Sequence, residues 1–102
     1  MVVDDHPIWR DAVARDLEAA GLDVCGTASD VAQAVRVAKA TRPDVVVLDL
    51  QLPDGSGVDV ARQIAGLDPT PRILVLSASG EQPDVLDAVA AGATGYLVKS
   101  AS

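Results

Sequence analysis

Three aspartates in this sequence stand at the ends of runs of apolar residues, and together they could bind a cation or accept a phosphoryl group. Asp4 and Asp5 come after Met1–Val3, and Asp49 comes after Val45–Leu48. Two carboxylates ~4 Å apart repel by about 4 kcal/mol at an effective dielectric constant of ~20, so such a cluster needs a compensating positive charge. Mg²⁺ prefers oxygen ligands of this kind, and a carboxylate can also act as a nucleophile toward phosphorus.

A serine and a lysine follow two further apolar runs. Ser77 comes after Ile73–Leu76, and Lys99 comes after Tyr96–Val98. Because parallel strands end at the same edge of a sheet, and ligands bind beyond that edge, we expect these side chains to join the aspartates there. The ammonium of Lys99 and the hydroxyl of Ser77 would then bind the phosphoryl oxygens that a cation does not neutralise.

The apolar runs themselves predict strands. Four of them are continuous rather than alternating, which is typical of strands buried on both faces of a parallel sheet. A weaker fifth run, Leu22–Cys25, alternates in character. Helical patterns lie between the runs, and this β-α alternation predicts a parallel sheet with helices on both faces.

The first two helices begin at recognisable signals. Pro7 suits a first helical turn. His6 is expected at this helix start without a catalytic role, and Trp9 is expected to be partly exposed. Ser29 is expected to cap the second helix. The face expected to turn inward on the second helix consists of Val31, Ala34, Val35 and Ala38.

The third and fourth helices are predicted in the same way. Ser56 and Asp59 are three residues apart and resemble a capping box at the start of the third helix. Pro83 suits the beginning of the fourth helix, and Gly92 suits the position just after its end. The residues expected to face inward are Val58, Ala61 and Ala65 in the third helix, and Val85, Leu86 and Val89 in the fourth.

The composition limits the function classes. A chain of 102 residues fits one small domain, and its formal net charge of −7 repels phosphate backbones, so direct DNA binding is not expected. With one Trp, one Tyr and no Phe, an aromatic surface for single-stranded nucleic acid is not expected either. No apolar stretch approaches the ~18 residues of a membrane span. The single cysteine, Cys25, is expected to be small and buried, and the lack of disulfides suits a cytoplasmic location.

Four motifs, in order along essentially the whole chain, resemble the receiver domain of bacterial two-component response regulators. They are V-V-D-D-H-P, L-D-L-Q-L-P-D-G-S-G, L-S-A and G-A-T-G-Y-L-V-K. The resemblance implies a flavodoxin-like, doubly wound α/β fold whose five parallel strands lie in the order 2-1-3-4-5. It also implies a signalling phosphoacceptor rather than an enzyme, with only self-phosphorylation and self-dephosphorylation chemistry.

The resemblance assigns a metal site and a phosphoacceptor. Asp49 is the phosphoacceptor, and it receives its phosphoryl group from a histidine kinase in the presence of Mg²⁺. Asp5 is a direct Mg²⁺ ligand, Asp4 is a nearby ligand that acts through water, and the backbone carbonyl of Gln51 is the third protein ligand. Gly57, together with Pro53, matches the loop that follows the acceptor.

The resemblance also assigns a switch. Ser77 is the switch hydroxyl, Lys99 is the cation that binds the phosphate, and Tyr96 is the switch aromatic residue. The first and last motifs look most like the class with a LuxR-type helix-turn-helix output. DNA would therefore be bound only through an output domain outside this chain, and a homodimer is a further expectation.

Two features depart from the family pattern. Lys99 is followed by Ser100 where many receivers have a proline in a cis peptide, and the chain stops at Ser102, where a fifth helix would follow. We therefore expect residues 1–102 to be a single receiver domain truncated before its fifth helix. We also expect apolar side chains of Ile73–Leu76 and Tyr96–Val98 to be exposed where that helix would lie.

Three other functions are weighed against this one. A haloacid dehalogenase-like phosphatase needs a second acid two residues after the nucleophile, where this chain has Gln51. A flavodoxin-like cofactor module needs a phosphate-binding loop after the first strand, where D-D-H-P would repel phosphate. A receiver that signals without phosphorylation, as an interaction module, stays open as the alternative.

Overall fold

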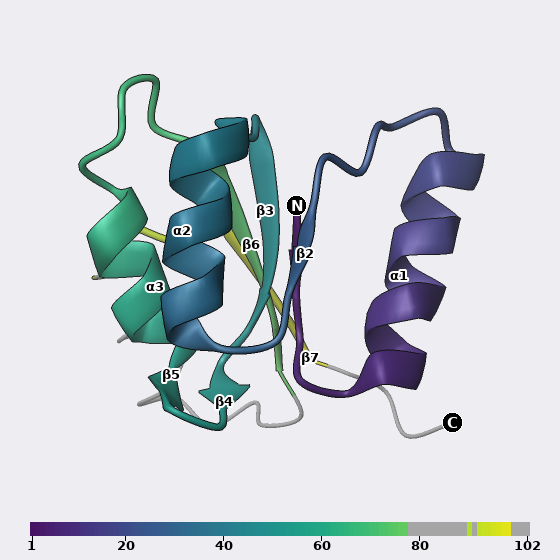
Figure 1. Cartoon of the computed structure of the whole chain (residues 1–102), viewed down its shortest axis with the longest axis horizontal. Helices are drawn as coiled ribbons and strands as arrows, with labels where there is room; N and C mark the ends of the chain where they lie inside the picture. The colour runs from purple at the N-terminus through teal and green to yellow at the C-terminus, as the bar shows by residue number, and fades with distance from the viewer. Residues whose placement is uncertain (78–89, 91, 99–102) are drawn as a thin grey trace.

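The computed structural model describes residues 1–77, 90 and 92–98, and its centre is one parallel sheet (Figure 1). The strands are β1 (Val2–Val3), β2 (Thr27–Ala28), β3 (Val45–Asp49), β6 (Arg72–Ser77) and β7 (Gly95–Val98). They lie in the order β2-β1-β3-β6-β7, and every adjacent pair is parallel. Since β6 and β7 are the fourth and fifth strands of this sheet along the chain, the predicted order 2-1-3-4-5 is confirmed.

Three described helices cover the two faces of the sheet. Figure 1 shows α2 (Val31–Thr41) and α3 (Gly57–Ile64) together on one face, and α1 (Pro7–Ala19) on the opposite face. The fourth predicted helix lies outside the described residues, although Gly92 has a φ of +106°. A left-handed value is what the residue after a helix commonly adopts, and glycine tolerates it.

The face under α2 and α3 holds the main hydrophobic core. The inward face predicted for α2 is confirmed, because all four of its residues are buried. For α3 the prediction is wrong at Ala65, which is exposed as the C-cap, but it is confirmed at Ala61, which is buried, and at Val58, which is half-buried and packs against the core. Val60 and Ile64 are larger than alanine and have more apolar surface to remove from water, so they set the inward face. The buried residues of α3 are Gly57, Val60, Ala61 and Ile64.

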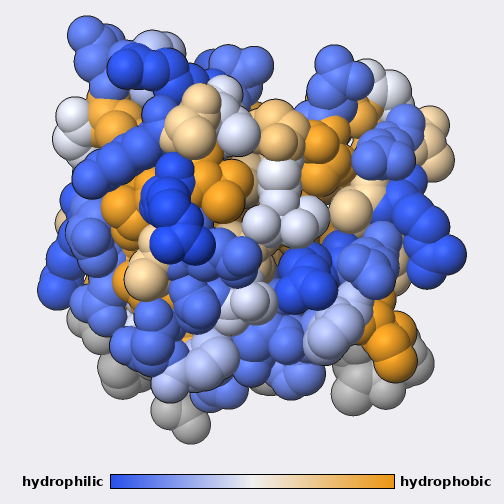
Figure 2. Space-filling model, in the orientation of Figure 1, coloured by the Kyte–Doolittle hydropathy of each residue, from blue (hydrophilic) through white to orange (hydrophobic). Residues whose placement is uncertain are grey.

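The face toward α1 is covered less completely. No residue of α1 is buried, and Val45 keeps 44% of its surface exposed. Leu74 on β6 is half-buried, while its neighbours Ile73 and Val75 point to the other face and are buried. On the side shown in Figure 2, apolar side chains reach the surface between α1 and the rest of the domain.

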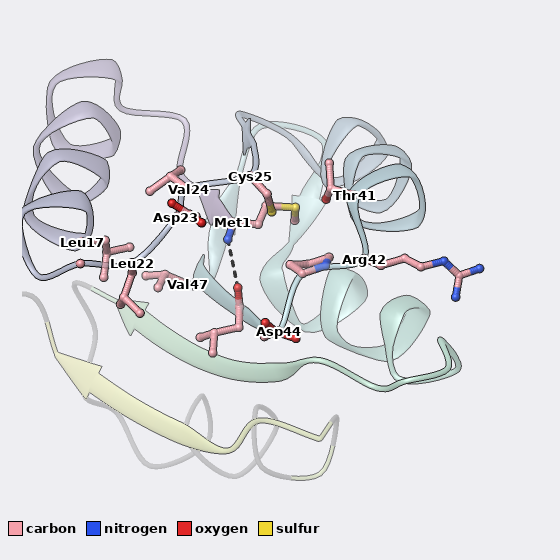
Figure 3. A pocket seen from close by; sticks show the side chains of 13 residues that line it. Met1, Leu17, Leu22, Asp23, Val24, Cys25, Thr41, Arg42, Asp44 and Val47 are labelled. Carbon is pink, nitrogen blue, oxygen red and sulfur yellow. Dashed lines mark hydrogen bonds between the residues drawn. The ribbon is translucent and has the colours of Figure 1, made fainter.

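The prediction of a strand at Leu22–Cys25 is wrong. The second strand begins later, at Thr27, because β1 has only two residues and its register pairs Val2 with Thr27. Residues 22–25 lie beyond this pairing and instead line a cavity of about 400 Å³ at the amino end of the sheet (Figure 3). Cys25 on this segment is exposed, so the expectation that it is buried is wrong too.

Helix capping follows the sequence at α3 but not at α2. The capping box of Ser56 and Asp59 is confirmed at α3. At α2 the cap is Asp30 rather than Ser29, because the Asp30 carboxylate accepts a hydrogen bond of 2.7 Å from the backbone N–H of Gln33. The Ser29 hydroxyl instead donates to the Gln33 side chain, at 3.0 Å.

Candidate functional site

Two neighbouring strands place two buried aspartates at the carboxyl end of the sheet. β1 and β3 pair in parallel with Val3 opposite Leu48, so Asp4 and Asp49 follow at the same level. Only 2% of Asp4 and 4% of Asp49 is exposed. Aspartate is almost never buried to this extent unless it is paired or bound. Burial of two carboxylates side by side therefore points to a functional site rather than to turn formation.

Asp5 and His6 complete a four-residue cluster with these two side chains. One potential ligand atom from each of the four residues lies within 4.8 Å of every other. Asp5 and His6 come from the turn between β1 and α1, and His6 is the N-cap residue of α1, as expected from its place before Pro7. The three predicted aspartates therefore meet at one edge, and a histidine joins them.

Hydrogen bonds within the cluster are shared unevenly. Asp4 Oδ1 accepts a hydrogen bond from the backbone N–H of His6 at 3.0 Å, and it lies 3.0 Å from His6 Nδ1. Asp5 Oδ1 lies 3.1 Å from the same nitrogen, but a single ring proton serves one acceptor. Among the described residues, Asp5 Oδ1 is buried and receives no hydrogen bond.

These donors fit a hard divalent cation. Three of the four groups offer carboxylate oxygens, which Mg²⁺ and Ca²⁺ prefer, and their spacing is compatible with one ion. A buried carboxylate oxygen that receives no hydrogen bond carries an unfavourable desolvation cost, which coordination would offset. The three aspartates of the predicted Mg²⁺ site are therefore chemically suited to hold the ion, and their role as ligands stays a prediction.

A short antiparallel hairpin carries the loop after Asp49. It consists of β4 (Gln51–Leu52) and β5 (Gly55–Ser56). The backbone N–H of Gln51 donates to Asp49 Oδ1 at 3.2 Å, so this loop holds the carboxylate in place. Gln51 was predicted to contribute its carbonyl to the metal site, and the hairpin keeps its backbone next to Asp49.

Gly57 allows the end of this hairpin to approach Asp49 closely. Its backbone N–H donates to the carbonyl of Leu50 at 2.8 Å. A Cβ added at Gly57 would lie 2.3 Å from the carbonyl oxygen of Asp49, well inside van der Waals contact. Only glycine fits here without moving the main chain of the candidate phosphoacceptor.

Asp54, at the tip of the hairpin, ties the site to α2. Its carboxylate accepts hydrogen bonds from the backbone N–H groups of Val31 at 2.7 Å and Ala32 at 3.3 Å. These are orphan donors of the first helical turn. The pKa of Asp54 is lowered from its ordinary value of 3.8, chiefly by the hydrogen bond from the Val31 N–H. Desolvation of the carboxylate raises the pKa in part, and the hydrogen bond from the Ala32 N–H lowers it further. The loop that holds Asp49 is therefore fastened to a second element.

The remaining predicted site residues are described in part. Ser77 is the last residue of β6, and its backbone pairs with Val98 of β7. Tyr96 lies within β7 opposite Val75. Their side chains, and all of Lys99, lie outside what the structure describes. The strand register nonetheless places the main chain of residue 77 at the same edge as Asp49, whose partner on β6 is Leu76.

Sequence reasoning missed two contributors to this edge. Asp54 was not singled out because its hydrogen-bond partners are 23 and 22 residues away along the chain. His6 was assigned only to the helix start, although its place directly after two aspartates was a usable signal. In the fold, its ring lies beside the carboxylates of Asp4 and Asp5.

The fold and the site together define a class: a parallel α/β domain with an acidic, cation-compatible site at the carboxyl edge of its sheet. The chain belongs to the response regulator receiver domain family, whose sequence model matches residues 1–102. It is thus a receiver domain of two-component response regulators, and the predicted resemblance is confirmed. Among the described residues, no helix is long and apolar enough to cross a membrane.

Similar proteins support this assignment. The DNA-binding transcriptional activator DevR/DosR of Mycobacterium tuberculosis is 43% identical over an alignment of 102 positions, which covers 96% of this chain and 46% of the relative. The chain thus spans about half the length of that protein. A LuxR-family two-component response regulator from Aurantimonas is 40% identical with a TM-score of 0.92, and the match covers 98% of this chain and 72% of that structure. The predicted likeness to regulators of the LuxR-type class is therefore confirmed.

A third relative bears on the cation. The response regulator TrrA from Thermotoga maritima, solved in complex with Mg²⁺-BeF, is 31% identical with a TM-score of 0.85. The match covers 99% of this chain and 85% of that structure. Family membership also sets aside the haloacid dehalogenase and cofactor-binding alternatives, since the whole chain matches the receiver pattern.

Proposed function

We propose that this chain is a phosphoacceptor that takes a phosphoryl group from a histidine kinase onto Asp49. The observation that carries the proposal is the burial of Asp49 beside Asp4 and Asp5, with one potential ligand atom of each within 4.8 Å. A carboxylate oxygen of Asp49 attacks the phosphorus of a phosphohistidine. The P–N bond breaks, the imidazole nitrogen leaves with the electron pair and takes a proton from solvent, and an acyl phosphate remains on Asp49.

The residues around Asp49 hold the reacting groups in place. Asp4, Asp5, Asp49 and the backbone carbonyl of Gln51 would hold Mg²⁺, which when bound supplies positive charge against the phosphoryl oxygens. The backbone N–H of Gln51 positions the attacking carboxylate through its hydrogen bond to Oδ1. Lys99 and Ser77 bind the remaining phosphoryl oxygens in this proposal.

Phosphorylation then biases a conformational switch. A phosphoryl group adds a charge of about −1.5 to −2 and strong acceptor oxygens, which draw the hydroxyl of Ser77 toward them. Tyr96, on the adjacent strand, moves inward in response, and the altered surface controls a DNA-binding output domain outside this chain. The net charge of −7 is consistent with a domain that does not itself bind DNA. A homodimer of the active form belongs to the same proposal.

Intact-mass spectrometry tests the phosphoacceptor. The chain is incubated with Mg²⁺ and acetyl phosphate, and one phosphoryl adduct is expected, absent in Asp49→Asn and suppressed by a chelator. Asp16→Asn, which removes an exposed carboxylate on α1, is the matched control and should keep the adduct. An adduct that persists in Asp49→Asn would show that another residue is the acceptor. No adduct in the wild-type chain would favour the phosphorylation-independent alternative.

A further inference from the structure

The ring of His6 is turned toward the cluster rather than used as a helix cap. His6 is the N-cap residue of α1, yet its side chain makes no capping hydrogen bond. Its Nδ1 lies 3.0 Å from Asp4 Oδ1 and 3.1 Å from Asp5 Oδ1, and 68% of the side chain remains exposed. The imidazole therefore presents one nitrogen to two carboxylates that the metal proposal already uses.

These separations match the spacing of ligands around one ion. With metal–ligand bonds of about 2.1 Å, adjacent ligands of an octahedral ion are ~3.0 Å apart and opposite ligands are ~4.2 Å apart. The two Nδ1–Oδ1 distances of 3.0 and 3.1 Å equal the shorter spacing. The potential ligand atoms of all four residues lie within 4.8 Å of one another. This upper bound exceeds the distance between opposite ligands by only about half an ångström.

We propose that His6 is a metal ligand through Nδ1, so that this site takes borderline first-row cations such as Co²⁺ and Zn²⁺ in addition to Mg²⁺. The proposal rests on the proposed function only for the location of the metal site. Imidazole adds much to the binding of Co²⁺ or Zn²⁺ and little to the binding of Mg²⁺, which keeps water in such positions. Asp5 Oδ1, a buried atom without a hydrogen bond among the described residues, lies 3.1 Å from the same nitrogen and is a second potential ligand atom.

A purely structural role for His6 makes a different prediction. If the ring only donated a hydrogen bond to Asp4, its loss would disturb the carboxylates and weaken every cation alike. If the ring is a ligand, its loss changes the selectivity between cations. The ratio of Co²⁺ affinity to Mg²⁺ affinity therefore distinguishes the two roles. A disturbance of the carboxylates that weakens both cations equally leaves this ratio unchanged.

Calorimetric titration of the chain with MgCl₂ and CoCl₂ measures that ratio. The titrations use a Cys25→Ser background, because the exposed thiol of Cys25 is itself a ligand for Co²⁺ and Zn²⁺. We expect His6→Gln, which retains an amide donor for the bond to Asp4, to lower the Co²⁺/Mg²⁺ ratio about tenfold. Asp5→Asn should weaken both cations and serves as the positive control. An unchanged ratio in His6→Gln overturns the proposal.

A spectroscopic readout is independent of affinity. His6 is the only histidine of the chain, so its ring gives one set of nitrogen resonances. Saturating ZnCl₂ should shift the Nδ1 resonance strongly, whereas MgCl₂ should shift it little. Equal small shifts with both ions overturn the proposal. Both readouts are obtained without a phosphodonor, so absence of the phosphoryl adduct on Asp49 would refute the proposed function and leave this result standing.

Discussion

Replacing Gly57 with alanine should displace the main chain of Asp49, the proposed phosphoacceptor. The new Cβ would lie 2.3 Å from the Asp49 carbonyl oxygen and 3.0 Å from the Leu50 Cα. Relief to an ordinary carbon–oxygen contact requires a movement of about 1 Å. That movement also stretches the 2.8 Å hydrogen bond from the Gly57 N–H to the Leu50 carbonyl. The perturbation is therefore focused on the two residues that present the Asp49 carboxylate.

Three contributions determine how much Gly57→Ala should lower the free energy of unfolding. Overpacking costs about 1–3 kcal/mol, and a weakened hydrogen bond costs about 0.5–1 kcal/mol more. The higher helix propensity of alanine offsets up to ~1 kcal/mol of this. A net loss of about 2 kcal/mol lowers the Tm of a domain of this size by roughly 8–16 °C. A displacement of ~1 Å at a reacting group can also slow its reaction by ~100-fold.

Gly66→Ala is the matched control, because a Cβ at Gly66 meets nothing within 4 Å. Thermal unfolding monitored by circular dichroism and the rate of phosphoryl uptake from acetyl phosphate are measured for both variants. Gly66→Ala should resemble the wild-type chain in both assays. If Gly57→Ala matches Gly66→Ala in Tm and in uptake rate, the close approach at Gly57 does not constrain Asp49 and the reasoning fails.

Three further perturbations test the core, the hairpin anchor and the proposed metal site. Ile64→Ala, at a fully buried position, should lower the free energy of unfolding measured in urea by about 2–5 kcal/mol. The control Ile8→Ala, at a position that is 87% exposed, should change this free energy by less than ~0.5 kcal/mol. Equal effects of the two substitutions would contradict the assigned core. Because the folded pKa of Asp54 is below 3.8, its stabilising contribution is present above the unfolded pKa and is lost as pH falls through the folded pKa. The difference in unfolding free energy between wild type and Asp54→Asn should therefore shrink as pH is lowered from 6 toward and below 3.8, and a difference independent of pH would refute the ionic anchor. MgCl₂ at ~100 times its Kd should stabilise the wild-type chain by about 2.7 kcal/mol and raise its Tm. The Tm of Asp5→Asn should rise clearly less, and an equal rise would show that the ion binds elsewhere.

The gross architecture and the meeting of the aspartates could be predicted from the sequence for one reason. Continuous apolar runs separated by helical patterns predict parallel strands, and a parallel sheet brings all residues that follow its strands to one edge. Asp4 and Asp49 needed no further information, because each directly follows such a run. The capping box at Ser56 is local in the same sense, since both partners lie within four residues.

The errors concern features that depend on distant parts of the chain. Whether Leu22–Cys25 forms a strand depends on the length of the neighbouring β1, which the pattern of residues 22–25 does not contain. The exposure of Cys25 follows from the same missing partner rather than from its residue type. Asp54 is a turn residue by composition, and only the folded structure brings its carboxylate to the first turn of α2.

The uneven covering of the two sheet faces has a consequence for how the proposed metal site opens. α2 and α3 bury their apolar faces in the core, whereas α1 buries no residue completely, so α1 is the described helix best able to detach by local opening without global unfolding. Asp49 belongs to β3, which opens only with the core, but Asp5 and His6 lie in the turn that leads directly into α1. A cation bound to both Asp49 and Asp5 would therefore link β3 to the segment that leads into α1. Its binding energy would be added first to the cost of local opening, so exchange of the α1 amides with solvent would be slowed at cation concentrations that leave the exchange of β3 amides almost unchanged.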